Sequence, residues 1–505
     1  MSGASGNQPI KLLSQDLSEN IKTLHTLLPI ERSFDLVTRE LYLGDTKGYW
    51  IGVNGFCKTD VLQQIFSDLQ NPLYMQDAQI TDLIRYMNSK IGFAQVEPEN
   101  RWEVLTRRLL SGPSLLFVEG FDQALILDAR TYPARGISEP ESERVTQGAR
   151  DGFVETMLFN ANLIRRHVRA NDLVFAVYNV GSASQTDVAV AYLENSVNKE
   201  LLEALVHKLK ELNKASNVTS LTMGAKSLSE LLVPHRWWNP LPSIQYTERP
   251  DVACSYLMEG HILILVDNSP QVLLLPGTIF QFTQSPEDYY KSPLVGSYFR
   301  MVRLACIPVA LLLLPVFLLL TVYYPQLGDK LQLLSTGHPQ PGRLILYIFT
   351  VEFMLDLFKY SAAQTSGRFS ASLSIVGGLL IGDVAVTLNW ASTEVLFYGA
   401  ISLLASLSIS SLEFSDALRV YRIFLLITTA AGGLAGFLAG FILVCLSCSL
   451  TPTFGGMSYF WPLFPWNQEA LSTLLFRYPT VKAQPSRIWN RGAVHTRTVP
   501  HGKDL

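Results

Sequence analysis

The distribution of apolar residues constrains this chain more than any other feature. Residues 304–322 read LACIPVALLLLPVFLLLTV and carry no charge. At about 1.5 Å per residue, a helix of this length matches the roughly 30 Å hydrocarbon core of a bilayer. Four more apolar stretches follow, near 344–358, 371–388, 394–412 and 423–447. The sequence therefore predicts a polytopic membrane region behind a long N-terminal part of ordinary, water-soluble composition.

The formal net charge of −3 conceals a division between these two parts. From Arg300 onward there are 14 Lys and Arg against 9 Asp and Glu, a balance of +5, which leaves −8 for the residues before it. An acidic soluble part argues against nucleic-acid binding, which needs a basic face. The basic membrane part suits anionic lipid headgroups and the positive bias of cytoplasmic loops. The lipid bilayer is therefore an expected partner, and nucleic acid is not.

The soluble part alternates hairpin and helix patterns. Turn residues between short apolar runs predict β-hairpins at 41–53, 114–127 and 261–275. Helical periodicity predicts helices at 59–69, 81–91, 152–168 and 199–212. Both patterns in one region indicate an α+β fold.

We therefore expect an α+β N-terminal region of two subdomains, followed by an all-α polytopic membrane domain. The expected boundaries are 1–140 and 141–298 for the subdomains, 299–450 for the transmembrane domain and 451–505 for a basic C-terminal tail. The N-terminus has no hydrophobic signal region, so the soluble part is expected to stay cytosolic.

The number of spans is open between four and five. Five crossings would place Arg419 and Arg422 on the cytosolic side, as expected, but would put the basic tail outside. Four crossings, with 371–388 re-entrant, would keep the tail inside but expose those two arginines. We slightly favour the cytosolic tail.

Two acidic residues stand inside an apolar stretch. Glu352 and Asp356 are four residues apart and so share one face of a helix. Acids in membrane helices are costly and normally face a bundle interior or a wet cavity. Two carboxylates so close are expected to titrate as a coupled unit. They predict either a cation-attracting or proton-linked pore wall, or a site near the headgroups with Lys359 and Lys330 as partners.

Glycines mark two further segments. Asp383 follows Gly377, Gly378 and Gly382, which suits a backbone that bends and lines a cavity, or close helix packing with the acid at an interface. A second series at four-residue spacing predicts close contact between helices, within or between subunits. This series consists of Gly432, Gly436 and Gly440.

Motifs of known catalytic sites are absent from the sequence. It contains no phosphate-binding or dinucleotide-binding glycine loop, no nucleophile elbow and no His-Glu-x-x-His. The five cysteines are scattered, and the Cys445 and Cys448 pair lies in an apolar stretch without further ligands. We expect no enzyme activity, no cofactor and no metal site.

A compact polar hexapeptide precedes the last predicted hairpin. It consists of Tyr246, Thr247, Glu248, Arg249, Pro250 and Asp251. Taken alone it indicates a salt-bridged turn or a helix cap, with an interaction surface as the alternative. Together with EGHILILVDNSP at 259–270 and SPEDYY at 285–290, it resembles the GerA family, the A-type subunits of bacterial spore germination receptors.

Three more motifs support this resemblance: DGFVET at 151–156, NLIRR at 162–166 and SIVGGLLIGD at 374–383. Residues 128–141 and 235–240 are similar to one branch of the family. The resemblance extends from about residue 15 to about residue 470.

The resemblance implies a cytosolic two-subdomain region and a helical membrane domain in the spore inner membrane, the cell membrane during sporulation. It also implies homo-oligomers, possibly pentamers, that work with other germination membrane proteins and let ions leave the spore core. We therefore expect a cation-permeable channel subunit, with Glu352, Asp356 and Asp383 as candidates for the ion path. A secondary transporter and a non-conducting scaffold are the alternatives.

Overall fold

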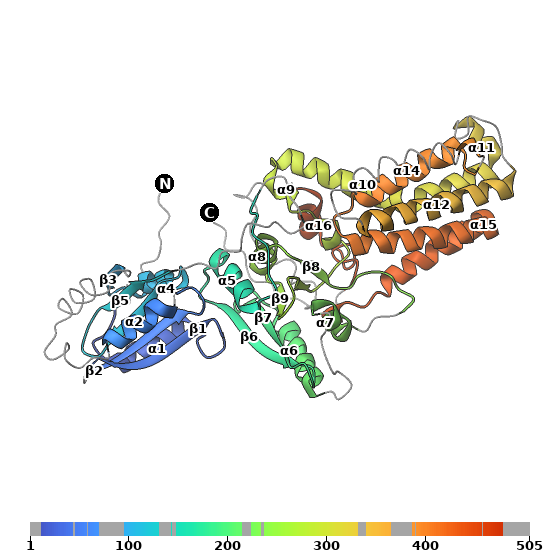
Figure 1. The fold of residues 1–505 in the computed structure, drawn as a ribbon. Coiled ribbons are helices and arrows are strands. Elements are labelled where there is room, and N and C mark those ends of the chain that lie inside the picture. Colours follow the sequence, from blue (N-terminus) through green and yellow to red (C-terminus); the bar gives the residue numbers. More distant parts are fainter. Residues whose placement is uncertain are drawn as a thin grey trace. The chain divides into compact units, whose positions relative to one another are not determined.

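The described part of the chain forms two compact units (Figure 1). The computed structural model describes residues 12–43, 46–57, 59–69, 95–130, 143, 148–214, 224–233, 237–331, 340–364, 386–388, 390–456 and 458–477. Unit 1 contains the described residues up to 233 together with 244–276, and unit 2 contains 237–243 and the residues from 277 onward. The helical unit thus starts earlier than the expected boundary at 298 and includes a short loop from the soluble region.

Unit 1 begins with a five-stranded antiparallel sheet in the order β1-β2-β4-β5-β3. Its strands are β1 (Leu36–Leu43), β2 (Thr46–Val53), β3 (Gln95–Glu99), β4 (Ser114–Val118) and β5 (Ala124–Asp128). The predicted hairpins at 41–53 and 114–127 correspond to β1-β2 and β4-β5. The helix predicted at 81–91 lies outside the described residues.

Helices cover both faces of this first sheet. Helices α1 (Leu17–Leu27) and α4 (Trp102–Leu110) pack on one face, where Leu24, Leu105 and Phe117 are buried together. Helix α2 (Thr59–Leu69) covers the other face through Ile65, which packs against Leu116. Because successive strand residues point to opposite faces, both sets of apolar side chains are buried.

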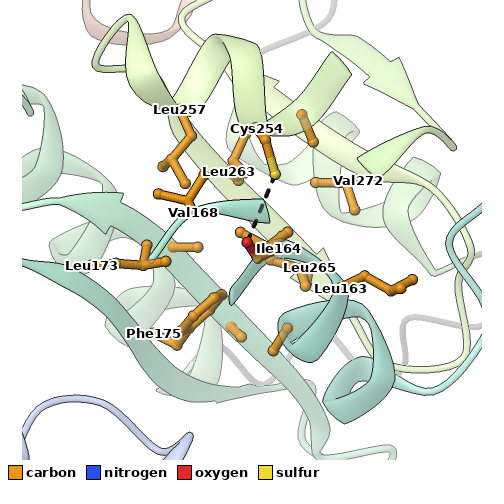
Figure 2. Close-up of a cluster of buried hydrophobic side chains, with 14 of the residues drawn as sticks. Leu163, Ile164, Val168, Leu173, Phe175, Cys254, Leu257, Leu263, Leu265 and Val272 are labelled. Carbon is orange, nitrogen blue, oxygen red and sulfur yellow. Dashed lines mark hydrogen bonds between the residues drawn. The ribbon is translucent and has the colours of Figure 1, made fainter. Parts of the chain in front are cut away.

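A second five-stranded antiparallel sheet follows, in the order β6-β7-β9-β10-β8. Its strands are β6 (Leu173–Val180), β7 (Thr186–Leu193), β8 (Gln245–Thr247), β9 (Ile262–Val266) and β10 (Val272–Leu275), and its helices are α5 (Met157–His167), α6 (Lys199–Lys214), α7 (Ala225–Leu232) and α8 (Pro250–Met258). Figure 2 shows the core between α5, α8 and the sheet, where the Cys254 thiol donates to the carbonyl oxygen of Ile164. Burial raises the pKa of that thiol well above its ordinary value.

The two halves of unit 1 repeat one fold. Strand order is the same in both sheets, and α1, α2 and α4 correspond to α5, α6 and α8. Individual hydrogen bonds repeat as well. The Asn20 side chain bonds both backbone polar groups of Ser14 (3.0 and 2.6 Å), as Asn160 does for Val154 (2.8 and 2.6 Å).

The helix starts are capped in the same way in both halves. Glu119 accepts from the backbone N–H of Leu17 at 3.1 Å, and Asp267 accepts from that of Met157 at 3.1 Å. Each carboxylate thus stabilises the positive end of a helix from a hairpin turn of the sheet beneath it. Unit 1, which we call the soluble unit, is therefore an internal duplication that was not predicted from the sequence.

Unit 2 is helical, and its longer helices form a bundle (Figure 1). Its elements are η2 (Gln281–Thr283), α9 (Glu287–Tyr290), α10 (Pro293–Leu318) with a π-helical extension η3 (Leu319–Tyr323), α11 (Pro325–Lys330), α12 (Pro341–Gln364), α14 (Thr393–Leu407), α15 (Leu412–Ser449), η4 (Phe454–Gly456) and α16 (Gln468–Leu475). By length and composition, α10 with its extension could cross a membrane, and α14 is a shorter apolar helix. Helix α15 also has the length and composition of a span, but a chain reversal divides it. Of the stretch 371–388, only residues 386–388 are described.

Helix α15 is a hairpin rather than the single span that the apolar stretch 423–447 indicates. The chain reverses at Gly433, whose backbone has φ 54° and ψ −132°. Residues other than glycine rarely adopt this backbone conformation. After the reversal, Gly436 lies against the Thr428 carbonyl. Near the open end, Tyr421 and Ser447 are hydrogen-bonded at 2.6 Å. The two arms therefore run antiparallel and in close contact.

Two apolar clusters fill the bundle at different levels. The basal cluster joins the first half of α10 to the open end of the α15 hairpin and includes Phe282, Phe414 and Tyr459. The distal cluster joins the second half of α10 to the starts of α12 and α14 and includes Ile348 and Val395. Residues that lie between these levels are enclosed on both sides by packed side chains.

Candidate functional site

Three ion pairs join α12 to the first arm of α15. We call them the ion-pair ladder: Glu352 with Arg422, Asp356 with Arg419, and Lys359 with Asp416. The spacing follows from helix geometry, since residues three or four apart on each helix share a face. The two helices run antiparallel here, so the later residue on α12 meets the earlier one on α15.

The innermost pair is fully buried. Arg422 approaches Glu352 through Nε and Nη2, each 2.9 Å from a carboxylate oxygen, and the two side chains are 1% and 3% exposed. Its Nη1 also donates to the Ala310 carbonyl of α10 and to the Ser402 hydroxyl of α14, both at 2.8 Å. Four helices thus meet at one polar layer between the basal and distal clusters.

Exposure increases along the ladder. The Asp356 side chain is 37% exposed and that of Arg419 is 10% exposed, whereas Asp416 reaches 61%. One end of the ladder is therefore enclosed in the bundle and the other opens at its surface. Its three acids and three bases balance, so the ladder carries no net charge.

The ladder changes the interpretation of Glu352 and Asp356. Each carboxylate has its own arginine on α15, Asp356 with Arg419 and Glu352 with Arg422. The expected lysine partners are wrong, since Lys359 pairs with Asp416. A charge buried in an apolar bundle needs a counter-charge, and the arginines three apart on α15 were the signal for it. Asp383, Gly377, Gly378 and Gly382 lie outside the described residues.

The glycine series allows close contact between segments of one chain. A Cβ added at Gly440 would overlap the Thr428 side chain, and one at Gly436 would overlap the Thr428 backbone. Gly432 precedes the reversal, and no described atom would lie within 4 Å of a Cβ there. Close helix contact is therefore present at two of the three positions, between the arms of α15.

The hexapeptide forms the salt-bridged start of α8. Arg249 is the residue before the helix and is fully buried, and Pro250 occupies the first turn. The Arg249 guanidinium donates to Asp251 at 2.8 and 3.1 Å and to the Ala149 carbonyl at 2.9 Å. Thr247 donates to Glu143 at 2.8 Å. These bonds hold Glu143 and Ala149 beside the start of α8.

Glu143 is the partly buried acid that accepts these bonds. Burial raises the pKa of its carboxyl, and the hydrogen bonds from Thr247 and from the Glu248 N–H oppose that rise. The hexapeptide therefore fixes the positions of Glu143 and Ala149, which precede the second subdomain's first helix.

Comparison with known proteins identifies the lineage. The family described as Bacillus/Clostridium GerA spore germination protein matches residues 23–487. The chain belongs to the GerA family. Its relatives include Stage V sporulation protein AF of Bacillus subtilis (strain 168), which is 31% identical over 90% of this chain and 91% of the relative.

Other GerA-family relatives align over similar lengths. Spore germination protein KA of Bacillus subtilis (strain 168) is 27% identical over 93% of this chain and 85% of the relative. The N-terminal domain of the A subunit of the Bacillus megaterium spore germinant receptor GerK3 has a crystal structure that is similar to 53% of this chain and 97% of that chain. It shows 24% identity and a TM-score of 0.41.

Proposed function

We propose that this chain is a membrane subunit that acts in spore germination, and that copies of it assemble into a cation-permeable channel in the spore inner membrane. Its membership of the GerA family supports the role in germination. The ion-pair ladder is the observation that carries the proposal for conduction, because an ion path needs polar groups at membrane depth. Other germination membrane proteins are the proposed partners.

The geometry favours a path between copies. The described helices of one chain enclose the basal and distal apolar clusters, which leaves the ladder's exposed end as the polar surface that a second copy would face. Asp356 and Asp416 lie at that end. Each of these carboxylates is more exposed than its basic partner, so a ring of copies would present them to the path and attract cations more than anions. The proposed assembly is therefore a homo-oligomeric ring, with the pentamer that the family resemblance implies as its candidate size.

The bundle also supports a cytosolic soluble unit and a cytosolic tail. Arg300, near the start of α10, donates to the carbonyls of Thr473 and Leu474 at 2.9 and 3.1 Å. Asn239 donates to Thr451, just after α15, at 2.9 Å. The chain thus enters and leaves the bundle at the same end, so the start of α10 and residues 451–477 belong on one side of the membrane, which we propose is the cytosolic side.

Ion flux tests this proposal. The full-length protein in liposomes should release K⁺, and Asp356→Asn should lower the preference for cations over anions several-fold. Glu103→Gln is the matched control, because it removes the same charge from an exposed position on α4 of the soluble unit. Native mass measurement should show an unchanged assembly for both variants.

A non-conducting scaffold is the second candidate, and one observation favours it: every acid of the ladder is neutralised by a basic residue. If Asp356→Asn and Glu352→Gln leave flux unchanged in an intact assembly, the acid-lined path is wrong. A monomeric protein without ion flux would support the scaffold. Saturable solute uptake driven by a proton gradient would indicate a transporter.

A further inference from the structure

Two loops lie side by side at the basal end of the helical unit. They are residues 237–242 and 459–466, and the Tyr459 hydroxyl donates to the Pro242 carbonyl at 3.0 Å. Tyr459 and Trp461 are 2% and 1% exposed, so the second loop is fixed by packing. Burial also raises the pKa of Tyr459 well above its ordinary value, which keeps its hydroxyl protonated as the donor.

The first loop is fixed by a buried asparagine. The Asn239 amide donates to Thr451 at 2.9 Å, and its oxygen accepts from the Tyr421 hydroxyl at 3.2 Å. The first arm of α15 and the residues just after its second arm are therefore bonded to this loop. The backbone of each loop is therefore held in place against the bundle.

These rigid loops present large aromatic side chains outward. The set, which we call the aromatic collar, consists of Trp237 (93% exposed), Trp238 (43%), Phe464 (74%) and Trp466 (66%). Large aromatic residues bury 150–250 Å² each when they pack, so a cluster held open marks an interaction surface. Indole rings have an apolar body and an N–H donor, which suits the boundary between acyl chains and water.

The collar lies at the level where the charge-free part of α10 begins. The Phe282 ring is 6.4 Å from that of Tyr459, and the carbonyl of the next residue, Thr283, accepts from Arg303 at 3.1 Å. Arg303 directly precedes the uncharged run 304–322. If that run spans the hydrocarbon core, the collar is at headgroup depth.

The first turns of α10 indicate an apolar environment at the same level. Leu294, Tyr298 and Met301 are 80%, 62% and 46% exposed and share one face of the helix. The Arg303 side chain points away from this face and donates to the Asp288 carboxylate at 2.9 and 3.0 Å. The apolar surface thus continues past the charged residues, because their charges are folded inward.

We propose that the aromatic collar is a lipid-binding surface that seats in the headgroup region on the side of the soluble unit and fixes the depth of the helical bundle. This inference rests on the membrane location in the proposed function and is independent of conduction. The collar would hold the base of α15, and with it the ladder, at a constant depth in the bilayer.

Photocrosslinking in vesicles of phosphatidylcholine and phosphatidylglycerol tests the collar. The photoreactive residue p-benzoylphenylalanine replaces Phe464 or Trp237 in the full-length protein, and Tyr42 as the control. Tyr42 is 58% exposed on β1 of the soluble unit. We expect lipid adducts at 464 and 237 about tenfold above those at 42, because the collar would be immersed among headgroups.

Vesicle flotation is measured first, to establish whether the protein is in the membrane. Protein that does not float with the vesicles would contradict both the proposed membrane location and the lipid-binding collar. Protein that floats but gives lipid adducts only at the Tyr42 level, or adducts mainly with a second copy, overturns the collar and leaves the location intact. Lipid adducts without ion flux support the collar and remove the channel.

Discussion

Arg165 in α5 and Asp35, just before β1, form a buried ion pair between the two halves of the soluble unit. Arg165 Nε donates to Asp35 Oδ2 at 2.7 Å, and the two side chains are 1% and 0% exposed. The guanidinium also donates to the carbonyls of Ala170 and Leu173 at 3.0 and 2.9 Å. Together with the bonds of Phe175 to Ser33 and Phe34, this pair joins the two halves.

Removing one partner of this pair should destabilise the soluble unit. Arg165→Ala leaves a buried carboxylate without its counter-charge, so we expect a loss of about 3–5 kcal/mol in the free energy of unfolding. Arg32 and Glu194 are the matched control, since they pair at 2.6 Å between the same halves but are 55% and 39% exposed. Arg32→Ala should cost about 1 kcal/mol or less. Equal losses in urea unfolding would contradict the role given to burial.

The ladder predicts a strong coupling between α12 and α15. Arg422→Met leaves Glu352 buried and unpaired, and we expect a loss of about 3–5 kcal/mol, much of which Glu352→Gln in the same chain should recover. Thermal unfolding of the detergent-solubilised protein gives the double-mutant cycle. The exposed pair, Lys359 and Asp416, is the comparison and should show a coupling below about 1 kcal/mol. Independent effects of the two buried substitutions would show that the pair does not join the helices.

The sequence predicted those features of the fold that depend on near neighbours. The hairpins at 41–53, 114–127 and 261–275 were found because short apolar runs and the turn residues between them lie within one short segment. The ladder was not found, because Glu352 and Arg422 are 70 residues apart along the chain. Each charge was visible inside an apolar stretch, but the choice of partner depends on how the helices pack.

Two other features could not be predicted for related reasons. The reversal at Gly433 lies inside an uninterrupted apolar stretch, where a glycine normally indicates packing rather than a turn. The internal duplication rests on a few equivalent residues, such as Asn20 with Asn160 and Glu119 with Asp267, whose roles appear only in their hydrogen bonds. Neither pattern has a period that a sequence search would detect.

The α15 hairpin should depend on which glycine of its series is replaced. Gly436→Leu would overlap the backbone of Thr428 in the opposite arm, so we expect the arms to separate and the melting temperature to fall by several degrees. Gly432→Leu is the matched control, because no described atom would lie within 4 Å of its Cβ. A cysteine pair at positions 421 and 447 should crosslink in the control but not in the Gly436 variant. Crosslinking in both would mean that close backbone approach is unnecessary.

His261 should make the soluble unit sensitive to mild acid. The ring is fully buried at the start of β9, 5.0 Å from the Tyr256 ring, and burial lowers its pKa to about 4 from an ordinary 6.5. Between these values the unfolded chain binds the proton and the folded chain does not. The contribution of the neutral ring to the free energy of unfolding is therefore fully present above about pH 6.5. It falls by about 3 kcal/mol as the pH is lowered to 4.

Urea unfolding of wild type and of His261→Phe across this range measures the effect. The variant carries no titratable ring at this position, so we expect its stability to vary less with pH than that of the wild type. His207→Gln is the control, because that histidine has a 77% exposed side chain on α6 and should leave the pH dependence unchanged. Since other acidic groups titrate in the same range, the decisive quantity is the difference between the two profiles. Parallel profiles for wild type and His261→Phe would show that the ring has the same pKa in the folded and unfolded protein, against its burial here.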